Sequence, residues 1–495
     1  MLLVLLWSVG IYLAFTIPLN TDSGWLLWVA QRMLDGAIYG KDIVELNPPL
    51  SAYIHFPPVL IAQALGVSVY PVFIAYTLAV IGMSVLLCQR VLRYSGLDDA
   101  DKRLILLSLT GALLFVCHAD IHLPRLSLKF GEREHFIIAF LLPYILLCWL
   151  RVEQQIAPIW LRVMGGALMG LAVCLKPHYA LVPLLLEGYC CYKQRRWGAW
   201  LNPATLTSGV VAMLYGIVLW RYTPEYWPIL HLTMDAYGSF GYGVLAKFIF
   251  FMPFLPLLLF LGVWQCYRKT HSSFHSLLPI LGFALFAAQC AGVVQNKGYP
   301  YHFLPFSILT VLLGVMSLRA FLSNDSLLSC LKKPAKHKAC MGVVVALLLM
   351  GLSIALPLSA GNFSFASKSI PLQTYLKKIS PRPQNAAVLS VEHTFYFPNT
   401  SGIYFTPRFI GLWLLVAEKT SLPAERKAEI RAYLRNSLAE DFQKHPPQIV
   451  FAYPPDLAKL INTPSAFHDV WQNYQKTDIL VVSPNYTFDV YTLKP

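Results

Sequence analysis

Acidic residues follow the first strongly apolar segment of the chain, residues 2–18. Asp22 comes directly after this segment, and Asp42 and Glu45 lie further along the same polar stretch. A carboxylate close to a reacting carbon can take a proton from an attacking hydroxyl group. Carboxylate oxygens are also the preferred ligands of hard divalent cations. We therefore expect Asp22 to act as a general base, and Asp42 and Glu45 to contact a substrate or a divalent metal ion.

Asp22 also has a simpler interpretation. It stands just before a run of residues with helical spacing, and Asp is a favoured residue at the start of a helix. Capping a helix and accepting a proton do not exclude each other, so both interpretations stay open.

Basic and aromatic residues form a second group, and each of them lies beside an apolar segment. Arg offers paired donors, Lys a compact charge, and His a donor that titrates near neutral pH. This chemistry suits a phosphate group whose lipid tail stays in the bilayer. The residues of the predicted phosphate site are Arg133, His135, Lys176, His178, Lys297, Tyr301 and His302. A single Lys or His in such a place is more often an interface anchor, so the prediction requires that all of them face one side of the membrane.

The composition is typical of a chain dissolved in a bilayer. Hydrophobic residues make up 56% and charged residues 13% of the sequence. Lys and Arg of membrane proteins collect in cytoplasmic loops, where they meet anionic lipid. The net charge of +14 is therefore explained by membrane topology and lipid contacts, and nucleic acid is not an expected partner. The 10 cysteines suggest neither a disulfide framework nor a zinc site.

Apolar segments of roughly the length needed to cross a bilayer recur along the chain. The clear ones are 2–18, 70–88, 132–150, 203–220, 245–264, 277–293, 303–321 and 341–357, and a shorter one is 104–117. Residues 163–191 are apolar except for Lys176-Pro177-His178 in their middle. They form either one long helix or two short helices that meet at Lys176.

The distribution of charge favours the two short helices. If residues 176–178 turn at the outer side, Lys and Arg gather in the later inner loops, and the corresponding outer loops hold only Arg221 and Lys297. This asymmetry follows the positive-inside rule, and Pro177 explains the break. The prediction is a polytopic α-helical membrane protein of about 11 transmembrane helices with a cytoplasmic N-terminus.

The outer side then contains two larger pieces of chain. The loop 19–69 shows helical spacing from Trp25 onward and again after Asn47-Pro48-Pro49, which predicts helices lying along the membrane interface. Residues 358–495 alternate strand-like and helix-like segments, which is typical of a small α/β domain. We therefore expect a transmembrane domain over 1–357 and a periplasmic α/β domain over 358–495.

Several of these segments resemble a known superfamily. Asp22, the segment Tyr39-Gly40-Lys41-Asp42 and the segment Glu45-Leu46-Asn47-Pro48-Pro49 resemble the first outer loop of GT-C glycosyltransferases. The likeness is to the bacterial branch related to protein O-mannosyltransferases and the lipid A aminoarabinose transferase. The segments around Arg133, Lys176 and His302 also resemble bacterial members. The resemblance covers roughly residues 1–320.

The resemblance implies a GT-C fold and a polyprenyl-phosphate sugar as donor, with Asp22 as the catalytic base. The acceptor would be a glycan, lipid or protein hydroxyl on the periplasmic face of a bacterial inner membrane. Many members carry a second acid beside this Asp, and here the neighbour is Ser23, so the use of a divalent metal stays open. A transporter or flippase of a lipid-linked saccharide is the rival prediction, although the chain shows no internal repeat. A lipid-anchored binding protein would not need ionisable groups inside the helices.

Overall fold

The computed structural model describes most of the chain in several stretches. These are residues 1–17, 19–118, 129–238, 273–295, 299–322, 372, 374–379, 381, 383–391, 404–483 and 486–494. They fall into two compact units, which we call the helical unit and the sheet unit. The helical unit draws on Met1–Asn20, Phe73–Ile217 and Tyr242–Gly361. The sheet unit draws on Thr21–Val72, Val218–Gly241 and Asn362–Pro495.

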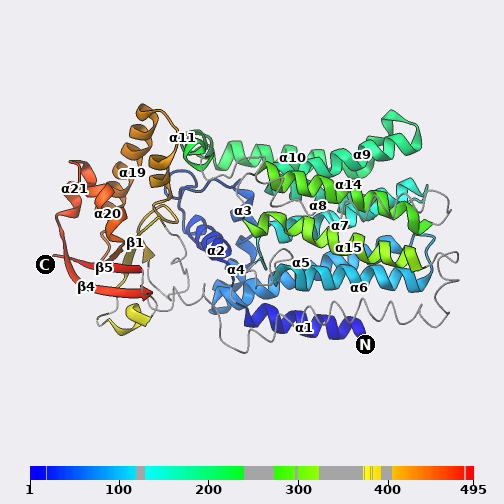
Figure 1. Ribbon diagram of the computed structural model, residues 1–495, viewed down its shortest axis with the longest axis horizontal. Helices are drawn as coiled ribbons and strands as arrows, with labels where there is room; N and C mark the ends of the chain where they lie inside the picture. Colours follow the sequence, from blue (N-terminus) through cyan, green and yellow to red (C-terminus); the bar gives the residue numbers. More distant parts are fainter. Residues whose placement is uncertain are drawn as a thin grey trace. The chain divides into compact units, whose positions relative to one another are not determined.

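The helical unit is a bundle of apolar helices (Figure 1). Its described helices are α1 (Leu2–Thr16), α5 (Val69–Leu92), α6 (Asp99–Phe115), α7 (Arg133–Val152), α8 (Ile159–Leu175), α9 (Leu181–Gln194), α10 (Pro203–Tyr222), α14 (Ser273–Val294) and α15 (Leu304–Leu322). Of these, α5 begins and α10 ends in the sheet unit. Short 3-10 turns accompany them: η1 (Val116–His118), η2 (Pro177–Ala180), η3 (Trp197–Trp200) and η4 (Pro300–Phe303).

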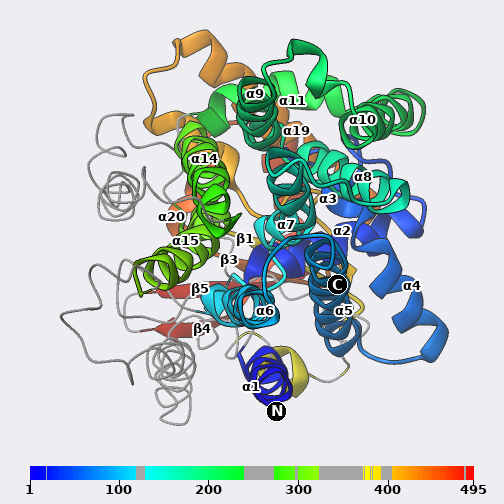
Figure 2. The ribbon, with the colours of Figure 1, turned by 90° about the vertical axis from the view of Figure 1, so that its right-hand side faces the viewer.

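Helix α7 is the centre of this bundle. It packs against α8, α9, α14 and α15, and Figure 2, which looks along the helices, shows it between them. Its side chains are buried from Arg133 through Leu150. A helix that is apolar on all sides is stable only when other helices or lipid surround it. The sequence of α7 is therefore compatible with its central place, and packing against its neighbouring helices decides it.

The predicted break at Lys176 is confirmed. Helix α8 ends at Leu175, Lys176 is extended with φ −147°, and Pro177 opens the turn η2 before α9 starts at Leu181. Proline cannot donate a helical hydrogen bond, and it pushes the residue before it out of the helical region. The break is therefore a local consequence of Pro177, and it places the Lys176 side chain at a helix end.

Two glycines allow α8 and α10 to approach closely. A Cβ atom on Gly166 would lie 2.2 Å from the carbonyl oxygen of Ala204. A Cβ atom on Gly170 would lie 3.1 Å from the Cα atom of Ser208. Small residues spaced by four are the usual means by which membrane helices bring their backbones together. This contact fixes α10 against the bundle.

The predicted spans agree with the described helices. Every span predicted within the described residues is helical, whereas 245–264 and 341–357 lie outside them. Among the described helices, those long and apolar enough to cross a membrane are Val69–Leu92, Arg133–Val152, Pro203–Tyr222 and Ser276–Val294. Shorter apolar helices include Leu2–Thr16 and Ile159–Leu175. These features fit a polytopic helical membrane protein.

The sheet unit contains a five-stranded sheet in the order β2-β1-β3-β5-β4. The strands are β1 (Asn385–Leu389), β2 (Tyr404–Phe405), β3 (Ile449–Ala452), β4 (Tyr474–Ser483) and β5 (Tyr486–Leu493). Strand β1 runs parallel to β2 and β3, whereas β5 runs antiparallel to both β3 and β4. The helical elements around it are α2 (Thr21–Leu34), α3 (Leu50–Tyr53), α4 (Phe56–Leu65), α11 (Tyr226–Gly238), η5 (Trp413–Lys419), α19 (Ala424–Lys444), α20 (Pro454–Ile461) and α21 (Ala466–Trp471).

Both faces of the sheet are covered by apolar cores. Because side chains alternate along each strand, neighbouring residues of one strand belong to different cores. In β3, Val450 belongs to an apolar core shared with Leu434 of α19. The neighbouring Phe451 belongs to a second core on the other face, shared with Trp25 and Val29 of α2. The α/β architecture predicted for the tail is therefore present, and the first loop of the chain supplies one of its covering helices.

Helix α2 differs from its prediction. Residues Ser23–Ala30 are all buried within the protein, so an interfacial helix with one face on lipid is the wrong description of α2. The physical reason is that Trp25, Leu26 and Trp28 pack in the sheet core. The loop also joins the tail through the backbone, since the Val44 N–H donates to the Arg408 carbonyl at 2.8 Å.

The units also divide the chain differently from the predicted boundary at residue 357. Residues 21–72 and 218–241 group with the tail that starts at residue 362. Segments far apart in sequence build this unit together, and composition along the chain does not reveal such grouping.

Candidate functional site

Asp22 is the second residue of α2 and is half-buried. The first turn of a helix presents unpaired N–H groups and a partial positive charge, which favour a carboxylate at this place. As the second residue of α2, Asp22 lies inside the first turn and not at the capping position before the helix. The acidic residues Asp22, Asp42 and Glu45 all belong to the sheet unit, whereas the predicted phosphate site belongs to the helical unit.

Glu45 is enclosed by hydrogen-bond donors. The Trp25 indole N–H donates to Glu45 Oε2 at 2.5 Å. The backbone N–H and the side-chain amide of Asn47 donate to Oε1 at 2.8 and 2.5 Å. Both carboxylate oxygens are thus bonded within the protein, and the side chain is buried.

Two tyrosines hold the turn that follows Glu45. Tyr39 donates its hydroxyl to the Asn47 carbonyl at 2.6 Å, and Tyr226 donates to the Leu46 carbonyl at 3.1 Å. Burial raises the pKa of the Tyr226 phenol, and the Glu45 carboxylate adds to this effect. Tyr226 therefore stays protonated at neutral pH and keeps its donor role.

Asp42 also has partners inside the sheet unit. Its Oδ2 accepts the Ile38 N–H at 2.9 Å, and its Oδ1 lies 3.9 Å from the Lys444 ammonium. The described residues contain no group of three or more His, Cys, Asp or Glu side chains arranged to hold a metal ion. Donors from the backbone and from Trp25 and Asn47 already engage oxygens of Asp42 and Glu45, so a divalent cation would have to displace these hydrogen bonds.

The predicted phosphate site contains a buried ion pair. Lys176, at the end of α8, donates to Glu134 Oε1 in the first turn of α7. The same ammonium donates to Gln295 Oε1, just after α14, at 2.7 Å. His302 Nε2 lies 3.8 Å from Glu134 Oε1. Four helix ends therefore meet around Lys176, which we call the Lys176 cluster: Glu134, Lys176, Gln295, Tyr301 and His302.

Aromatic rings complete this cluster. The Lys176 ammonium lies 5.8 Å from the centre of the Tyr301 ring, within the range of a cation–π contact. Tyr301 packs edge-on to His302 at 4.5 Å and stacks with Tyr299 at 5.6 Å between ring centres. Tyr179 of η2 donates to the His302 carbonyl at 2.9 Å and so ties the broken helix to α15.

The remaining predicted phosphate ligands have different surroundings. Arg133 is buried in the first turn of α7, and its charge acts on Lys176. His135 is a core histidine, since its Nε2 lies 2.9 Å from the Leu113 carbonyl and its Nδ1 accepts the Gly131 N–H at 3.3 Å. His178 is exposed in η2. Lys297 lies outside the described residues.

Glu134 is a member of the Lys176 cluster that was not among the predicted site residues. The prediction named its neighbours Arg133 and His135 as phosphate ligands, whereas the side chain that pairs with Lys176 is that of Glu134. Successive residues of a helix point about 100° apart, so at most one of Arg133, Glu134 and His135 could face a given partner. A buried charge is usually paired with an opposite charge. A lysine inside an apolar segment, such as Lys176, therefore indicates that an acidic partner is needed.

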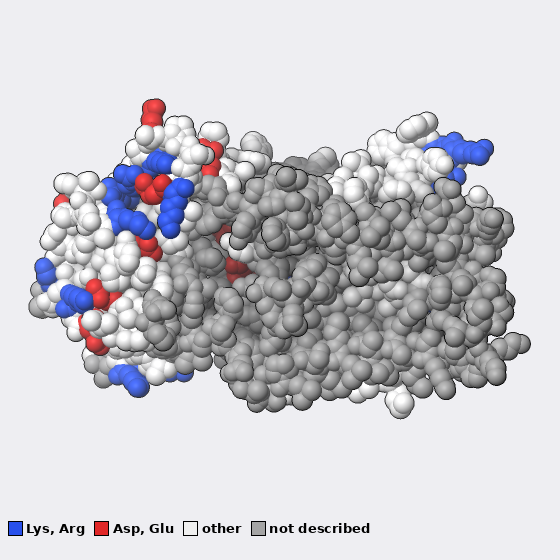
Figure 3. Space-filling view, viewed as in Figure 1, with Lys and Arg blue, Asp and Glu red and all other residues white. Residues whose placement is uncertain are grey.

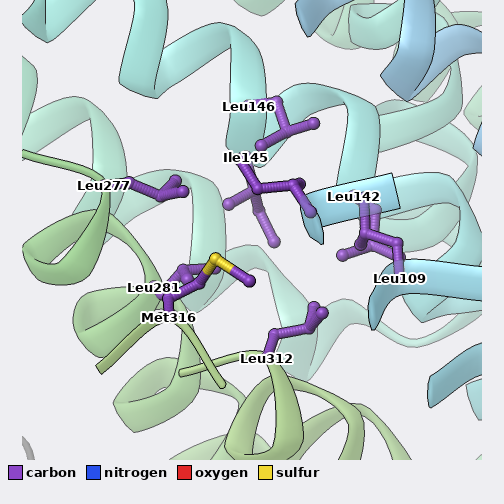
Figure 4. Close-up of a pocket in the computed structure, with 9 residues that line it drawn as sticks. Leu109, Leu142, Ile145, Leu146, Leu277, Leu281, Leu312 and Met316 are labelled. Atoms are coloured by element: carbon purple, nitrogen blue, oxygen red, sulfur yellow. The ribbon is translucent and has the colours of Figure 1, made fainter. Parts of the chain in front are cut away.

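A small apolar cavity of the helical unit lies elsewhere. It has a volume of about 10 Å³ and is lined by side chains of α6, α7, α14 and α15. Leu109, Leu142 and Met316 are among the labelled side chains in Figure 4. None of the lining residues is polar, so this cavity cannot bind a phosphate or a sugar.

Charged side chains on the sheet unit gather over α19 and its neighbours (Figure 3). Arg431 binds Glu418 through two hydrogen bonds of 2.6 and 2.7 Å. Arg426 pairs with Asp235 at 2.8 Å, and Arg408 pairs with Asp441 at the same distance. Because these cations have acidic partners, we assign them to the stability of the sheet unit.

Comparisons with known proteins place the fold. A crystal structure of ArnT from Cupriavidus metallidurans, bound to undecaprenyl phosphate, matches with a TM-score of 0.58 and 15% identity, over 99% of this chain and 97% of that one. A cryo-EM structure of the arabinofuranosyltransferase AftD from Mycobacteria matches with a TM-score of 0.37 and 13% identity, over 100% of this chain and 40% of that one. No protein-family model and no curated protein sequence matches the chain. The likeness to ArnT extends over nearly the full length of both chains, and the chain therefore has the same fold as ArnT.

Proposed function

We propose that this protein is an integral-membrane glycosyltransferase that takes a sugar from a polyprenyl-phosphate donor. The observation that carries the proposal is the Lys176 cluster, a buried group of ionisable side chains at one end of the bundle. Ionisable residues inside membrane bundles are costly and usually mark a functional site. The fold supports the donor class, because the ArnT structure of the same fold was solved with undecaprenyl phosphate.

In this proposal Lys176 binds the donor phosphate. An ammonium has three N–H bonds, and those to Glu134 and Gln295 account for two of them. The third can donate to a phosphate oxygen, and His302 can supply a further donor. Tyr301 can stack on the sugar or donate to the phosphate. Arg133, His178 and Lys297 remain proposed contributors, whereas both ring nitrogens of His135 already contact the backbone of Leu113 and Gly131.

The proposed reaction inverts the anomeric carbon. Asp22 takes the proton of an acceptor hydroxyl while the hydroxyl oxygen forms a bond to the anomeric carbon. The bond from that carbon to the phosphate oxygen breaks, and its electron pair leaves with the phosphate. Lys176 and His302 stabilise the charge that develops on the leaving group. The step is written with side chains alone, and Asp42 and Glu45 supply no ligand in it because their oxygens already accept hydrogen bonds within the sheet unit.

The membrane orientation supports an acceptor on the outer face. The distribution of Lys and Arg among the loops predicts a cytoplasmic N-terminus and places the end of α8, with Lys176, on the opposite side in the predicted topology. For a bacterial inner membrane this side is the periplasm, and the sheet unit would lie there too. The acceptor would be a glycan, a lipid or a protein hydroxyl.

The test is turnover by the purified full chain with a polyprenyl-phosphate sugar. We expect transfer by the wild type and a loss of at least about 100-fold in Lys176→Gln, since an electrostatic contact to a developing anion is worth about that much. Lys193→Gln is the matched control, because Lys193 is exposed at the end of α9. Equal turnover in Lys176→Gln and Lys193→Gln would remove Lys176 from the site.

A flippase for a lipid-linked saccharide is the second candidate. The observation that favours it is the broken helix at α8 and α9, because discontinuous helices commonly form the substrate sites of transporters. Movement of labelled lipid between the leaflets of proteoliposomes, with no sugar transferred, would establish this function in place of the glycosyltransferase.

A further inference from the structure

Glu45 has the surroundings of a structural residue and not those of a ligand. Its hydrogen bonds to Trp25 and Asn47 form what we call the clamp. Its side chain is only 8% exposed. Oε2 accepts the Trp25 indole N–H, and Oε1 accepts both N–H groups of Asn47. Hydrogen bonds to an ionised carboxylate are short and strong. Binding a metal ion or a sugar through Glu45 would require these bonds to break inside the protein, which is costly.

The clamp acts on the helix turn that carries Asp22. Trp25 lies three residues after Asp22 on α2, so both side chains lie on nearly the same side of the helix. The far end of the clamp is held as well, because Tyr39 bonds the Asn47 carbonyl and Tyr226 bonds the Leu46 carbonyl. The first turn of α2 is thus tied to a segment that is itself fixed on two sides.

We infer that Glu45 is a positioning residue, which holds Asp22 in its reactive orientation through Trp25. This inference rests on the proposed role of Asp22 as general base. A base must come within hydrogen-bond reach of the proton that it removes, and a misplacement of 1 Å can cost about 100-fold in rate. A carboxylate suits the clamp because it accepts every donor, whereas glutamine would turn its own N–H₂ toward Trp25 or Asn47.

The main test compares Glu45→Gln with the wild type and with Asp35→Asn, a control in which an exposed carboxylate of the same chain segment is changed. We expect kcat of Glu45→Gln to fall about 10- to 100-fold, with KM for the donor changed by less than about twofold because ground-state binding is retained. The control should keep both constants. A rise in KM with kcat unchanged, or recovery of activity with added Mg²⁺, would show that Glu45 is a ligand and overturn the inference.

A second variant separates the clamp from any direct role of the carboxylate. Trp25→Phe removes the indole N–H and leaves Glu45 in place. If Glu45 acts through Trp25, Trp25→Phe lowers kcat as Glu45→Gln does, again with little change in KM. Unchanged kcat in Trp25→Phe would mean that the bond between these side chains does not position the base.

A double variant tests whether the effect passes through Asp22. In an Asp22→Asn background the base is already absent, so adding Glu45→Gln should reduce the residual turnover by less than about twofold. If the two losses multiply, Glu45 acts independently of Asp22, and the positioning role is wrong.

Hydrogen exchange gives a readout that does not depend on turnover. Glu45→Gln should raise the exchange of α2 amides from Trp25 onward, whose N–H groups donate helical hydrogen bonds, whereas amides of α19 should exchange as in the wild type. Unchanged exchange in α2 overturns the clamp even if the enzyme transfers sugar. An inactive wild type in which Glu45→Gln still loosens α2 would instead mean that the clamp exists and that the proposed function is wrong.

Discussion

Lys176 and Glu134 form a buried ion pair that joins the end of α8 to the first turn of α7. The two residues are 42 positions apart in the sequence. Removing one member of such a pair leaves an uncompensated charge in the protein, whereas replacing both by apolar residues is often tolerated. The pair therefore links the stability of the bundle to the proposed phosphate site.

Glu134→Ala should destabilise the protein by about 3–5 kcal/mol, since the Lys176 ammonium loses its counter-charge. The double variant Glu134→Leu with Lys176→Met should recover most of this loss in a thermal melt of the detergent-solubilised protein. It should not recover turnover, because no ammonium remains to contact a phosphate. Full activity in the double variant would mean that the pair serves stability alone.

Asp22→Asn should reduce turnover by about 100- to 10,000-fold, the range that general-base catalysis contributes. Its melting temperature should fall only slightly, because the interaction of a carboxylate with a helix start contributes about 0.3–1 kcal/mol. Asp35→Asn is the matched control, since Asp35 follows the other end of α2. Wild-type turnover by a folded Asp22→Asn protein would assign Asp22 to the helix end only.

Gly166→Ala should destabilise the helical unit, because the new Cβ would lie 2.2 Å from the Ala204 carbonyl oxygen and would push α8 and α10 apart. Overpacking of this kind typically costs about 1–3 kcal/mol. Gly216→Ala in α10 is the control: nothing lies within 4 Å of its Cβ position, and alanine is favoured over glycine in helices. Thermal melts should therefore shift down for Gly166→Ala and slightly up, or not at all, for Gly216→Ala.

The half-buried Tyr375 and the exposed Asp478 should together make a small, pH-dependent contribution to the stability of the sheet unit. The Tyr375 hydroxyl donates to Asp478 at 2.7 Å and lowers the pKa of this carboxyl, to which the Ile479 N–H adds. A carboxyl whose folded-state pKa is lowered contributes stability above its unfolded pKa of about 3.9 and loses it as the pH falls further.

We expect the melting temperature of Asp478→Asn to lie slightly below that of the wild type at neutral pH, and the difference to shrink as the pH falls through the lowered pKa of Asp478. Tyr375→Phe should show the same trend, because it removes the same hydrogen bond from the other side. A difference that grows toward acid pH would contradict the direction of the pKa shift.

Local chemistry made much of the fold predictable from the sequence. The positions of the helices, the break at Pro177 and the strand-and-helix pattern of the tail depend on apolar runs and on proline, whose effects act over a few residues. The same reasoning identified Lys176, Tyr301 and His302, which the structure brings into one cluster. Asp22 remains a proposed base whose position at the start of α2 is consistent with that role.

Tertiary structure decided which side chains meet. Glu134 lies beside Lys176 only because α7 packs against the broken helix. His135 turns to a backbone carbonyl, and Glu45 turns to Trp25, although each looked like a ligand in the sequence. Helix α2 is buried by a sheet whose strands lie more than 300 residues further along the chain. Such contacts depend on long-range packing, and the sequence by itself specifies residue types and local backbone geometry but not the partner that folding brings to each side chain.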